Sequence, residues 1–109
     1  MQTIQLNVQE PYLSFILNGQ KTIEGRLNKG KFKDLKTGDV LLVGPEEKKF
    51  LIEMTTIYKS FREMIEKEGI ENVIPDKDNI YEAESVYYGF YTKEQEKEFG
   101  VLAIKIKEL

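Results

Sequence analysis

The sequence predicts an α+β, mainly β fold: a small barrel of five or six mostly antiparallel strands with two or three helices. Three observations predict it. Apolar and polar residues alternate near both ends of the chain, at residues 2–8 and 101–107, as in strands that bury one face. Helix signals lie between these ends. The chain has 109 residues, which is the length of one domain. We therefore expect a single domain over residues 1–109, closed or nearly closed, with adjacent first and last strands.

The first half of the chain is predicted to be mostly strand. Four strands are expected, at residues 2–8, 22–27, 40–43 and 50–58. A helix begins at Glu10-Pro11 and ends at Asn18-Gly19, because proline suits the first helical turn and glycine the left-handed C-cap. Residues 29–36 form a basic connector that could contain one helical turn. Residues 44–47 join the next two strands as a hairpin connection. The alternation in the fourth strand predicts one shared side for Ile52, Met54, Thr56 and Tyr58.

The second half is predicted to be helical before a final strand. Two helices are expected, over residues 61–68 and 80–88. Ser60 and Glu63 have the spacing of a capping box, and Gly69 ends the first of these helices. Residues 70–78 form a connector. Residues 92–100 begin with another capping box but are short and charged, so they are either a surface helix of one or two turns or a loop. In the last strand, three residues should face the core: Leu102, Ile104 and Ile106.

The composition excludes several kinds of chemistry. The chain has neither cysteine nor histidine, so it has no disulfide, no thiolate nucleophile and neither of the side chains that bind zinc most often. No D-x-D-x-D-G run that could form a calcium loop is present. We therefore expect no metal and no cofactor. No apolar run approaches the ~20 residues needed to span a bilayer, and residues 1–8 do not resemble a signal peptide. A cytoplasmic protein without membrane contact is the expectation.

Charge is distributed unevenly along the chain. The net charge is −3, which disfavours a protein that coats nucleic acid nonspecifically. Residues 20–36, however, contain six basic side chains against only Glu24 and Asp34. Residues 61–99 contain five basic and eleven acidic side chains. A local field steers a polyanion more effectively than the total charge does, although runs of charge are also common on solvated faces.

The stretch Gly19-Gln20-Lys21-Thr22-Ile23-Glu24-Gly25-Arg26 is the candidate site. It reads G-x-K-x-x-E-x-R where a helix passes into a strand. Glu24 and Arg26 are two apart on the strand and share a face, and Lys21 in the preceding turn could reach them. Such a group could bind an anion, read the polar edge of a base or transfer a proton. The alternative is an ordinary network of ion pairs on the barrel wall.

This stretch resembles the signature of the ASCH domain family, which belongs to the PUA-like superfamily. Residues 35–39, with the sequence L-K-T-G-D, resemble the turn that precedes a barrel strand in that family. Tyr91, the charged segment after it and residues 99–104 resemble the closing strand of a small prokaryotic subgroup. The resemblance covers about residues 12–106. It implies a PUA-like barrel with a cleft, and members that are proposed to act on RNA or to bind it.

The resemblance also bears on catalysis. One bacterial branch hydrolyses acetylated cytidine, and another is reported as a ribonuclease. In the first branch a threonine nucleophile occupies the position of Glu24, so this chain lacks it, and Thr22 is two residues away. Lys21 matches that branch's essential lysine. Candidates for its catalytic glutamate lie in the predicted helical region: Glu66, Glu68, Glu71 and Glu82.

Five aromatic residues gather late in the chain: Tyr81, Tyr87, Tyr88, Phe90 and Tyr91. Aromatic rings can stack on the bases of single-stranded nucleic acid, but in small domains they more often pack in the core. Tyr91 is kept as a candidate cleft residue because it lies in the segment that resembles the family.

The leading hypothesis is a module that binds RNA, a nucleotide or a modified nucleoside. Its expected ligand-binding residues are Lys21, Thr22, Glu24, Arg26 and Tyr91. The alternative is a small hydrolase, acting on a modified nucleoside or on RNA, in which Lys21 and Glu24 would be catalytic. A domain that only contacts another protein is the third hypothesis.

Overall fold

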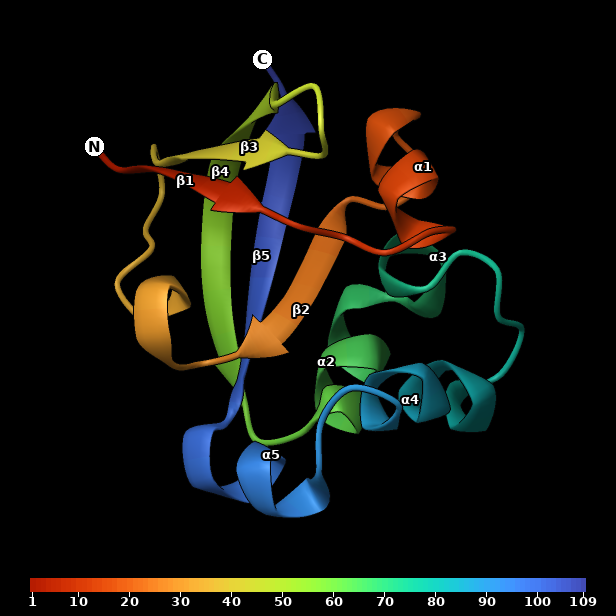
Figure 1. Ribbon diagram of the computed structural model, residues 1–109. Coiled ribbons are helices and arrows are strands. Elements are labelled where there is room, and N and C mark those ends of the chain that lie inside the picture. The colour runs from red at the N-terminus through yellow and green to blue at the C-terminus, as the bar shows by residue number, and fades with distance from the viewer.

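The computed structural model describes all 109 residues, and Figure 1 shows the order of the elements. The strands are β1 (Thr3–Leu6), β2 (Ile23–Leu27), β3 (Val40–Val43), β4 (Lys48–Tyr58) and β5 (Val101–Glu108). The α-helices are α1 (Tyr12–Leu17), α2 (Phe61–Glu68), α3 (Ile70–Val73), α4 (Ile80–Tyr88) and α5 (Lys93–Phe99). A short 3-10 helix at Gly30–Phe32 is the single turn expected in the basic connector. None of the helices is both long and apolar enough to cross a membrane.

The five strands form one curled sheet, half of a barrel, in the order β1-β3-β4-β5-β2. All neighbouring strands are antiparallel except β1 and β3, which are parallel. The predicted fold class is therefore confirmed. The prediction that the first and last strands are adjacent is wrong, because β4 and β2 occupy the two edges of β5. The β1 strand joins β3 instead, where the Asp39 carboxylate accepts a hydrogen bond from the Gln2 amide at 2.8 Å.

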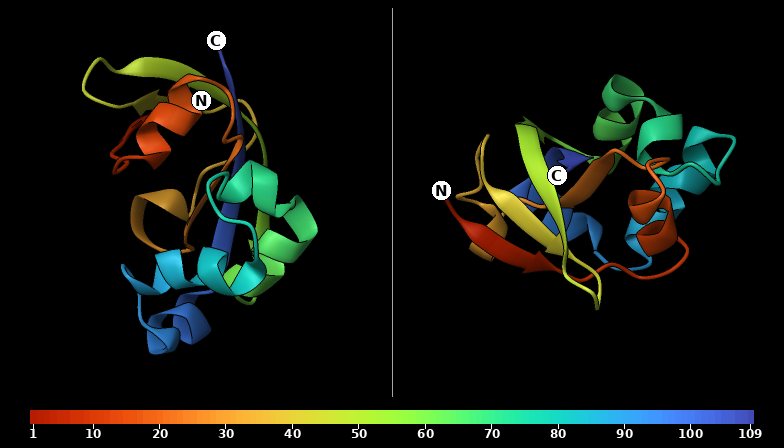
Figure 2. Two further views of the ribbon diagram at one scale, coloured as in Figure 1. Left: turned by 90° about the vertical axis from the view of Figure 1, so that its right-hand side faces the viewer. Right: turned by 90° about the horizontal axis from the view of Figure 1, so that it is seen from above.

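Strand β5 lies between two apolar cores. Val101 and Ala103 pack with the helices α2 and α4, whereas three residues of the opposite face pack inside the half-barrel: Leu102, Ile104 and Ile106. The face of β5 with Leu102, Ile104 and Ile106 was predicted to be buried, but the face with Val101 and Ala103 is buried as well. Helices α2, α3 and α4 cover the face with Val101 and Ala103, as the views of Figure 2 show. The edge strand β2 lies between the half-barrel and the helices.

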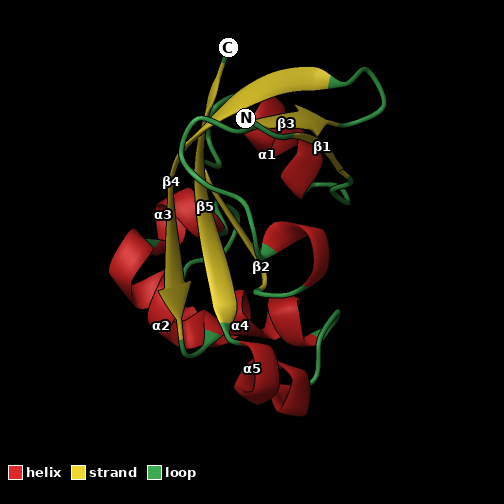
Figure 3. Ribbon diagram, turned by 90° about the vertical axis from the view of Figure 1, so that its left-hand side faces the viewer, coloured by secondary structure: helices red, strands yellow, loops and turns green.

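A β-bulge in β4 changes which side chains face the helices. The pairing with β5 skips a residue between Ile52 and Met54, so the alternation reverses at Glu53. Ile52 packs inside the half-barrel, while Tyr58 packs against the helical core. The prediction of one shared side for residues 52, 54, 56 and 58 is therefore wrong. The long course of β4 between the two regions is visible in Figure 3.

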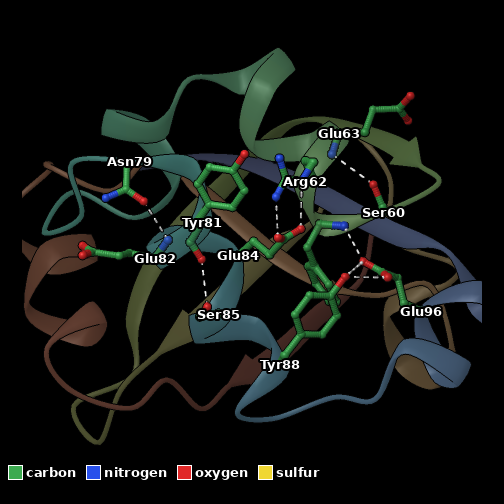
Figure 4. A network of polar contacts seen from close by, with 11 residues as sticks. Ser60, Arg62, Glu63, Asn79, Tyr81, Glu82, Glu84, Ser85, Tyr88 and Glu96 are labelled. Carbon is green, nitrogen blue, oxygen red and sulfur yellow. Dashed lines mark hydrogen bonds and ion pairs between the residues drawn. The ribbon is translucent and has the colours of Figure 1, made fainter.

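More helices form than the two or three predicted. Four residues of the expected connector form α3, and the charged segment after Thr92 forms α5, with both hydrogen bonds of the capping box present. Glu96 of α5 points inward. Its carboxylate accepts a hydrogen bond from the Phe61 amide at 2.7 Å and others from the Tyr88 hydroxyl at 2.8 and 2.9 Å. Figure 4 shows these contacts beside the ion pair between Arg62 and Glu84 that joins α2 to α4. Together they fix the position of α4.

Candidate functional site

Three charged side chains from the turn before β2 and from β2 itself form one connected group. The Glu24 carboxylate lies between two cations: Lys21 Nζ is 3.4 Å from Oε1, and Arg26 Nε donates a hydrogen bond to Oε2 at 2.8 Å. Glu24 and Arg26 share a face of β2, as the strand period requires. We call this group the charged triad.

Lys21 is almost fully buried, with 2% of its surface exposed. Its ammonium donates hydrogen bonds to the Ile23 carbonyl at 2.7 Å and to the Val73 carbonyl of α3. Burial lowers the pKa of Lys21, and the adjacent Glu24 carboxylate opposes that change. Lys21 therefore joins the end of α3 to β2 and holds one oxygen of Glu24 in place.

Arg26 is less buried and spans the gap to the segment that follows β1. Its Nη2 donates a hydrogen bond to the Asn7 carbonyl at 2.6 Å. The guanidinium carbon lies 5.2 Å from the centre of the Phe32 ring, within the range of a cation–π contact. These contacts use Nε and one proton of Nη2, so the remaining N–H groups of the guanidinium are available to a ligand.

A cleft of about 210 Å³ opens along the free edge of β2. Polar groups line one part of it, namely Asn7, Gln9, Lys21, Glu24, Gly25 and Arg26. Apolar and aromatic side chains line the rest, namely Val8, Tyr12, Ile74, Val86, Tyr87, Phe90 and Tyr91. A drug-sized ligand usually occupies ~300–1,000 Å³, so this cleft suits a smaller ligand.

The aromatic wall of the cleft is built on a stack of three rings. Phe61 lies between Tyr87, at 4.4 Å between ring centres, and Tyr91, at 5.5 Å, and all three rings are nearly parallel. Tyr87 is buried and its hydroxyl has no hydrogen-bond partner. Phe90 beside this stack is 52% exposed. An exposed ring at the mouth of a cleft offers a face on which a planar ligand can stack.

Gly25 lets β2 approach the helices closely. A Cβ atom at this position would lie 2.6 Å from Cε of Met64 and 3.2 Å from the Tyr87 hydroxyl. Met64 is fully buried, so its side chain has little room to move. The absence of a side chain therefore lets Met64 and Tyr87 pack directly against β2.

Comparison with known proteins agrees with this geometry. The model of the ASCH domain matches residues 6–109. The chain belongs to the ASCH domain family. The resemblance seen in the sequence is thereby confirmed. ASCH domains have a PUA-like fold that is generally associated with RNA binding.

Two solved structures are similar to this ASCH domain over nearly their whole length. The crystal structure of the archaeal hypothetical protein PH0355 has a TM-score of 0.94 and 41% sequence identity, covering 99% of this chain and 100% of that one. The solution NMR structure of protein PF0455 from Pyrococcus furiosus has a TM-score of 0.83 and 42% identity, covering 100% and 98%. No curated protein gives a significant match.

The structure brings together four of the five predicted ligand-binding residues of the ASCH domain. Lys21, Glu24, Arg26 and Tyr91 line the cleft, but Thr22 does not. The backbone of Thr22 is fully used: its amide donates to the Asn72 carbonyl and its carbonyl accepts from the Ile106 amide. The four candidate glutamates of the helical region also lie outside the cleft lining. No group of three or more acidic side chains is arranged to hold a metal ion.

Much of the cleft lining was not predicted from the sequence, including Tyr12, Gly25 and the hydroxyl of Tyr87. A glycine inside a strand was an available signal, because such glycines often mark a close approach of backbone or ligand. Tyr87 was counted among the aromatics expected in the core, and it is both a core ring and a cleft residue. No feature of the sequence distinguishes Tyr12 from other helix residues.

The tyrosines of the ASCH domain make its stability sensitive to alkaline pH. Burial and the nearby Asp76 carboxylate raise the pKa of Tyr12 to about 12, and burial with Glu68 raises that of Tyr58 to about 12. Because the unfolded chain ionises tyrosine near pH 10, this contribution to stability is complete below that pH and is lost as the pH rises through about 12. Denaturant unfolding at increasing pH should show the loss.

Asp76→Asn is the matched variant for this prediction. It removes the carboxylate but keeps the shape, so the pKa of Tyr12 should fall toward the ordinary value while that of Tyr58 stays raised. Titration of tyrosinate absorbance measures both. If Asp76→Asn leaves the titration curve unchanged, the charge of Asp76 does not act on Tyr12.

Proposed function

We propose that this ASCH domain binds a single nucleobase or nucleotide of RNA in the cleft beside the charged triad. The observation that carries the proposal is the Glu24 carboxylate, held by Lys21 and Arg26 at the floor of a cleft with aromatic walls. Sequence-specific proteins take unstacked RNA bases between aromatic or guanidinium planes and read their edges with hydrogen bonds. A fixed carboxylate accepts from base N–H groups, and a guanidinium donates to carbonyl oxygens.

The basic connector supports contact with the phosphates on either side of the bound base. Arg26 lies over Phe32 of this connector, and Lys31 donates a hydrogen bond to the Gln5 carbonyl at 2.7 Å, so the connector lies beside the mouth of the cleft. Lys29 and Lys33 on the same segment are exposed. Lysines near a bound strand release counterions, so binding should weaken as salt increases.

Hydrolysis of a modified nucleoside has less support than binding. Such a reaction needs a nucleophile, and the Thr22 hydroxyl does not line the cleft. Both oxygens of Glu24 already contact a cation. The lowered pKa of Lys21 would suit proton transfer, but its ammonium is already bonded to two backbone carbonyls. The contacts of Lys21 and Glu24 therefore suit a rigid binding surface better than a catalytic site.

Calorimetric titration with short single-stranded RNA tests the proposal. Glu24→Gln should weaken binding by about 1–3 kcal/mol, because a charged acceptor is replaced by a neutral one. Arg26→Met should weaken it by a similar amount and reduce its dependence on salt. Lys49→Met is the matched control, because it removes one exposed positive charge outside the cleft lining. If both cleft variants bind RNA as tightly as the unaltered protein, the cleft is not the binding site.

A further inference from the structure

The free edge of β2 presents an unused pair of backbone groups to the cleft. In the antiparallel pairing with β5, even-numbered residues make the hydrogen bonds. On either side of β2, the Thr22 carbonyl accepts from the Ile106 amide and the Asn28 amide donates to the Gly100 carbonyl. The odd-numbered residues therefore direct their N–H and C=O groups away from β5. The Ile23 carbonyl is occupied by Lys21 Nζ. Gly25 is buried, lines the cleft and has only this free edge for its two groups.

A second, independent group beside Gly25 also lacks a partner. The Tyr87 hydroxyl is buried without a hydrogen bond, in a residue that is 6% exposed and lines the same cleft. It would lie 3.2 Å from a Cβ atom placed on Gly25, so it is adjacent to that residue. Buried polar groups without partners are costly, and two such groups at one point indicate a ligand that completes them.

These groups form a defined pattern of donors and acceptors. The Gly25 amide is a donor and the Gly25 carbonyl is an acceptor. The Tyr87 hydroxyl can donate or accept, and we assign it as a second donor because its O–H has no acceptor in the structure. The pattern complements a ligand edge with two carbonyl oxygens on either side of one N–H. Among the RNA bases only uracil has such an edge, the imide formed by O2, N3–H and O4. Cytosine has two adjacent acceptors beside an amino group, guanine has one acceptor beside two donors, and adenine has no carbonyl.

We propose that the cleft recognises the imide edge of a uracil-type base through the backbone of Gly25 and the hydroxyl of Tyr87. This inference rests on the proposed function and names the base. The Gly25 carbonyl accepts from N3–H, its amide donates to one carbonyl of the base, and Tyr87 donates to the other. Because Gly25 and Tyr87 take the whole imide edge, Glu24 and Arg26 contact the ribose hydroxyls and the phosphate of the same nucleotide.

Titration of the isotopically labelled protein with three nucleotides, followed by NMR, tests this inference. The probes are the 5′-monophosphates of uridine, cytidine and N3-methyluridine, of which the last has the same charge and sugar but no N3–H. The uridine nucleotide should bind at least about tenfold more tightly than the other two, because each of those leaves buried polar groups unpaired. The amide signal of Gly25 should shift with the uridine nucleotide and much less with its N3-methyl analogue.

Tyr87→Phe is the companion variant, since it removes one hydroxyl and keeps the ring that stacks on Phe61. It should fold as stably as the unaltered protein and bind the uridine nucleotide about threefold to tenfold more weakly, as expected for one neutral hydrogen bond. Unchanged affinity would overturn the role given to Tyr87.

The outcomes separate this inference from the proposed function. If all three nucleotides bind with equal affinity and each shifts the NMR signals of cleft residues, recognition of the imide edge is overturned while nucleotide binding in the cleft still holds. If neither the nucleotides nor short RNAs shift any signal of the cleft, both fail.

Discussion

Replacing Glu24 with methionine is expected to lower the free energy of unfolding by about 3–5 kcal/mol, the cost of leaving a buried charge without its partner. Lys21 is 2% exposed and its charge is compensated mainly by this carboxylate, while Arg26 repels it. Methionine fills a similar volume, so the lost charge pair dominates the change. Urea denaturation of the variant and of the unaltered protein gives the difference directly.

The double variant Lys21→Met/Glu24→Met is the control for this prediction. It removes both buried charges, and Arg26 can turn to solvent because 20% of its side chain is already exposed. We expect it to be more stable than Glu24→Met alone, since well-packed apolar side chains often replace a buried ion pair without loss. If the double variant is less stable than the single one, the charge of Lys21 is not what destabilises Glu24→Met.

The pH dependence of Glu24→Met gives an independent test. Burial lowers the pKa of Lys21 below its ordinary 10.5, and loss of Glu24 removes the main cause that opposes this change. Between the lowered pKa of Lys21 in the native state and its ordinary pKa in the unfolded chain, the unfolded chain binds more protons than the native state. The free energy of unfolding therefore rises with pH in this range. The variant should therefore recover part of its lost stability as the pH rises toward the ordinary lysine value of 10.5. The unaltered protein should recover less.

Replacing Glu96 with alanine should lower the free energy of unfolding by about 2–4 kcal/mol. Hydrogen bonds to a charged group are lost, and the buried donors stay unpaired. The donors are the Phe61 amide, at the first turn of α2, and the Tyr88 hydroxyl. Phe61 is also the central ring of the stack behind the cleft, so the variant should bind RNA more weakly as well.

Glu98→Ala is the matched control on the same helix. Glu98 is exposed and takes part in none of these hydrogen bonds, so its loss should change stability by no more than about 0.5 kcal/mol. Thermal unfolding of both variants compares the same change of charge at a buried and an exposed position. Equal effects would show that Glu96 does not anchor α2.

The sequence predicted the elements better than their partners. Every strand was identified, either from alternation or, at residues 40–43, from a short apolar run, because both are local properties of the chain. These signals did not identify the neighbour of β1, since a short strand of four residues can pair wherever an edge is free. The bulge at Glu53 was also invisible, and with it the change of side along β4. In α5 the charged composition indicated a surface segment, yet Glu96 faces inward because α2 needs an acceptor at its first amide.

The candidate site was predicted where residue types and strand period act together. Glu24 and Arg26 share a face, and Lys21 reaches them from the turn, as the spacing indicated. Thr22 was predicted with them but is not among the residues that line the cleft. The opposite wall depends on how α4 packs against β2, which is a property of the folded chain and not of any local pattern. The place of Tyr87 in the cleft could therefore be recognised only in three dimensions.

Because successive side chains of β5 enter different cores, this strand belongs to both the half-barrel and the helical core. Neither core can open without exposing side chains attached to the same backbone, so partial unfolding at this strand costs nearly as much as global unfolding. Amide hydrogens of β5 should then exchange with solvent more slowly than any others in the protein. A ligand that tightens β2 against the helices would also restrict β5, which pairs with β2. Amide exchange should then slow inside the half-barrel as well, although the residues of its core do not touch the ligand.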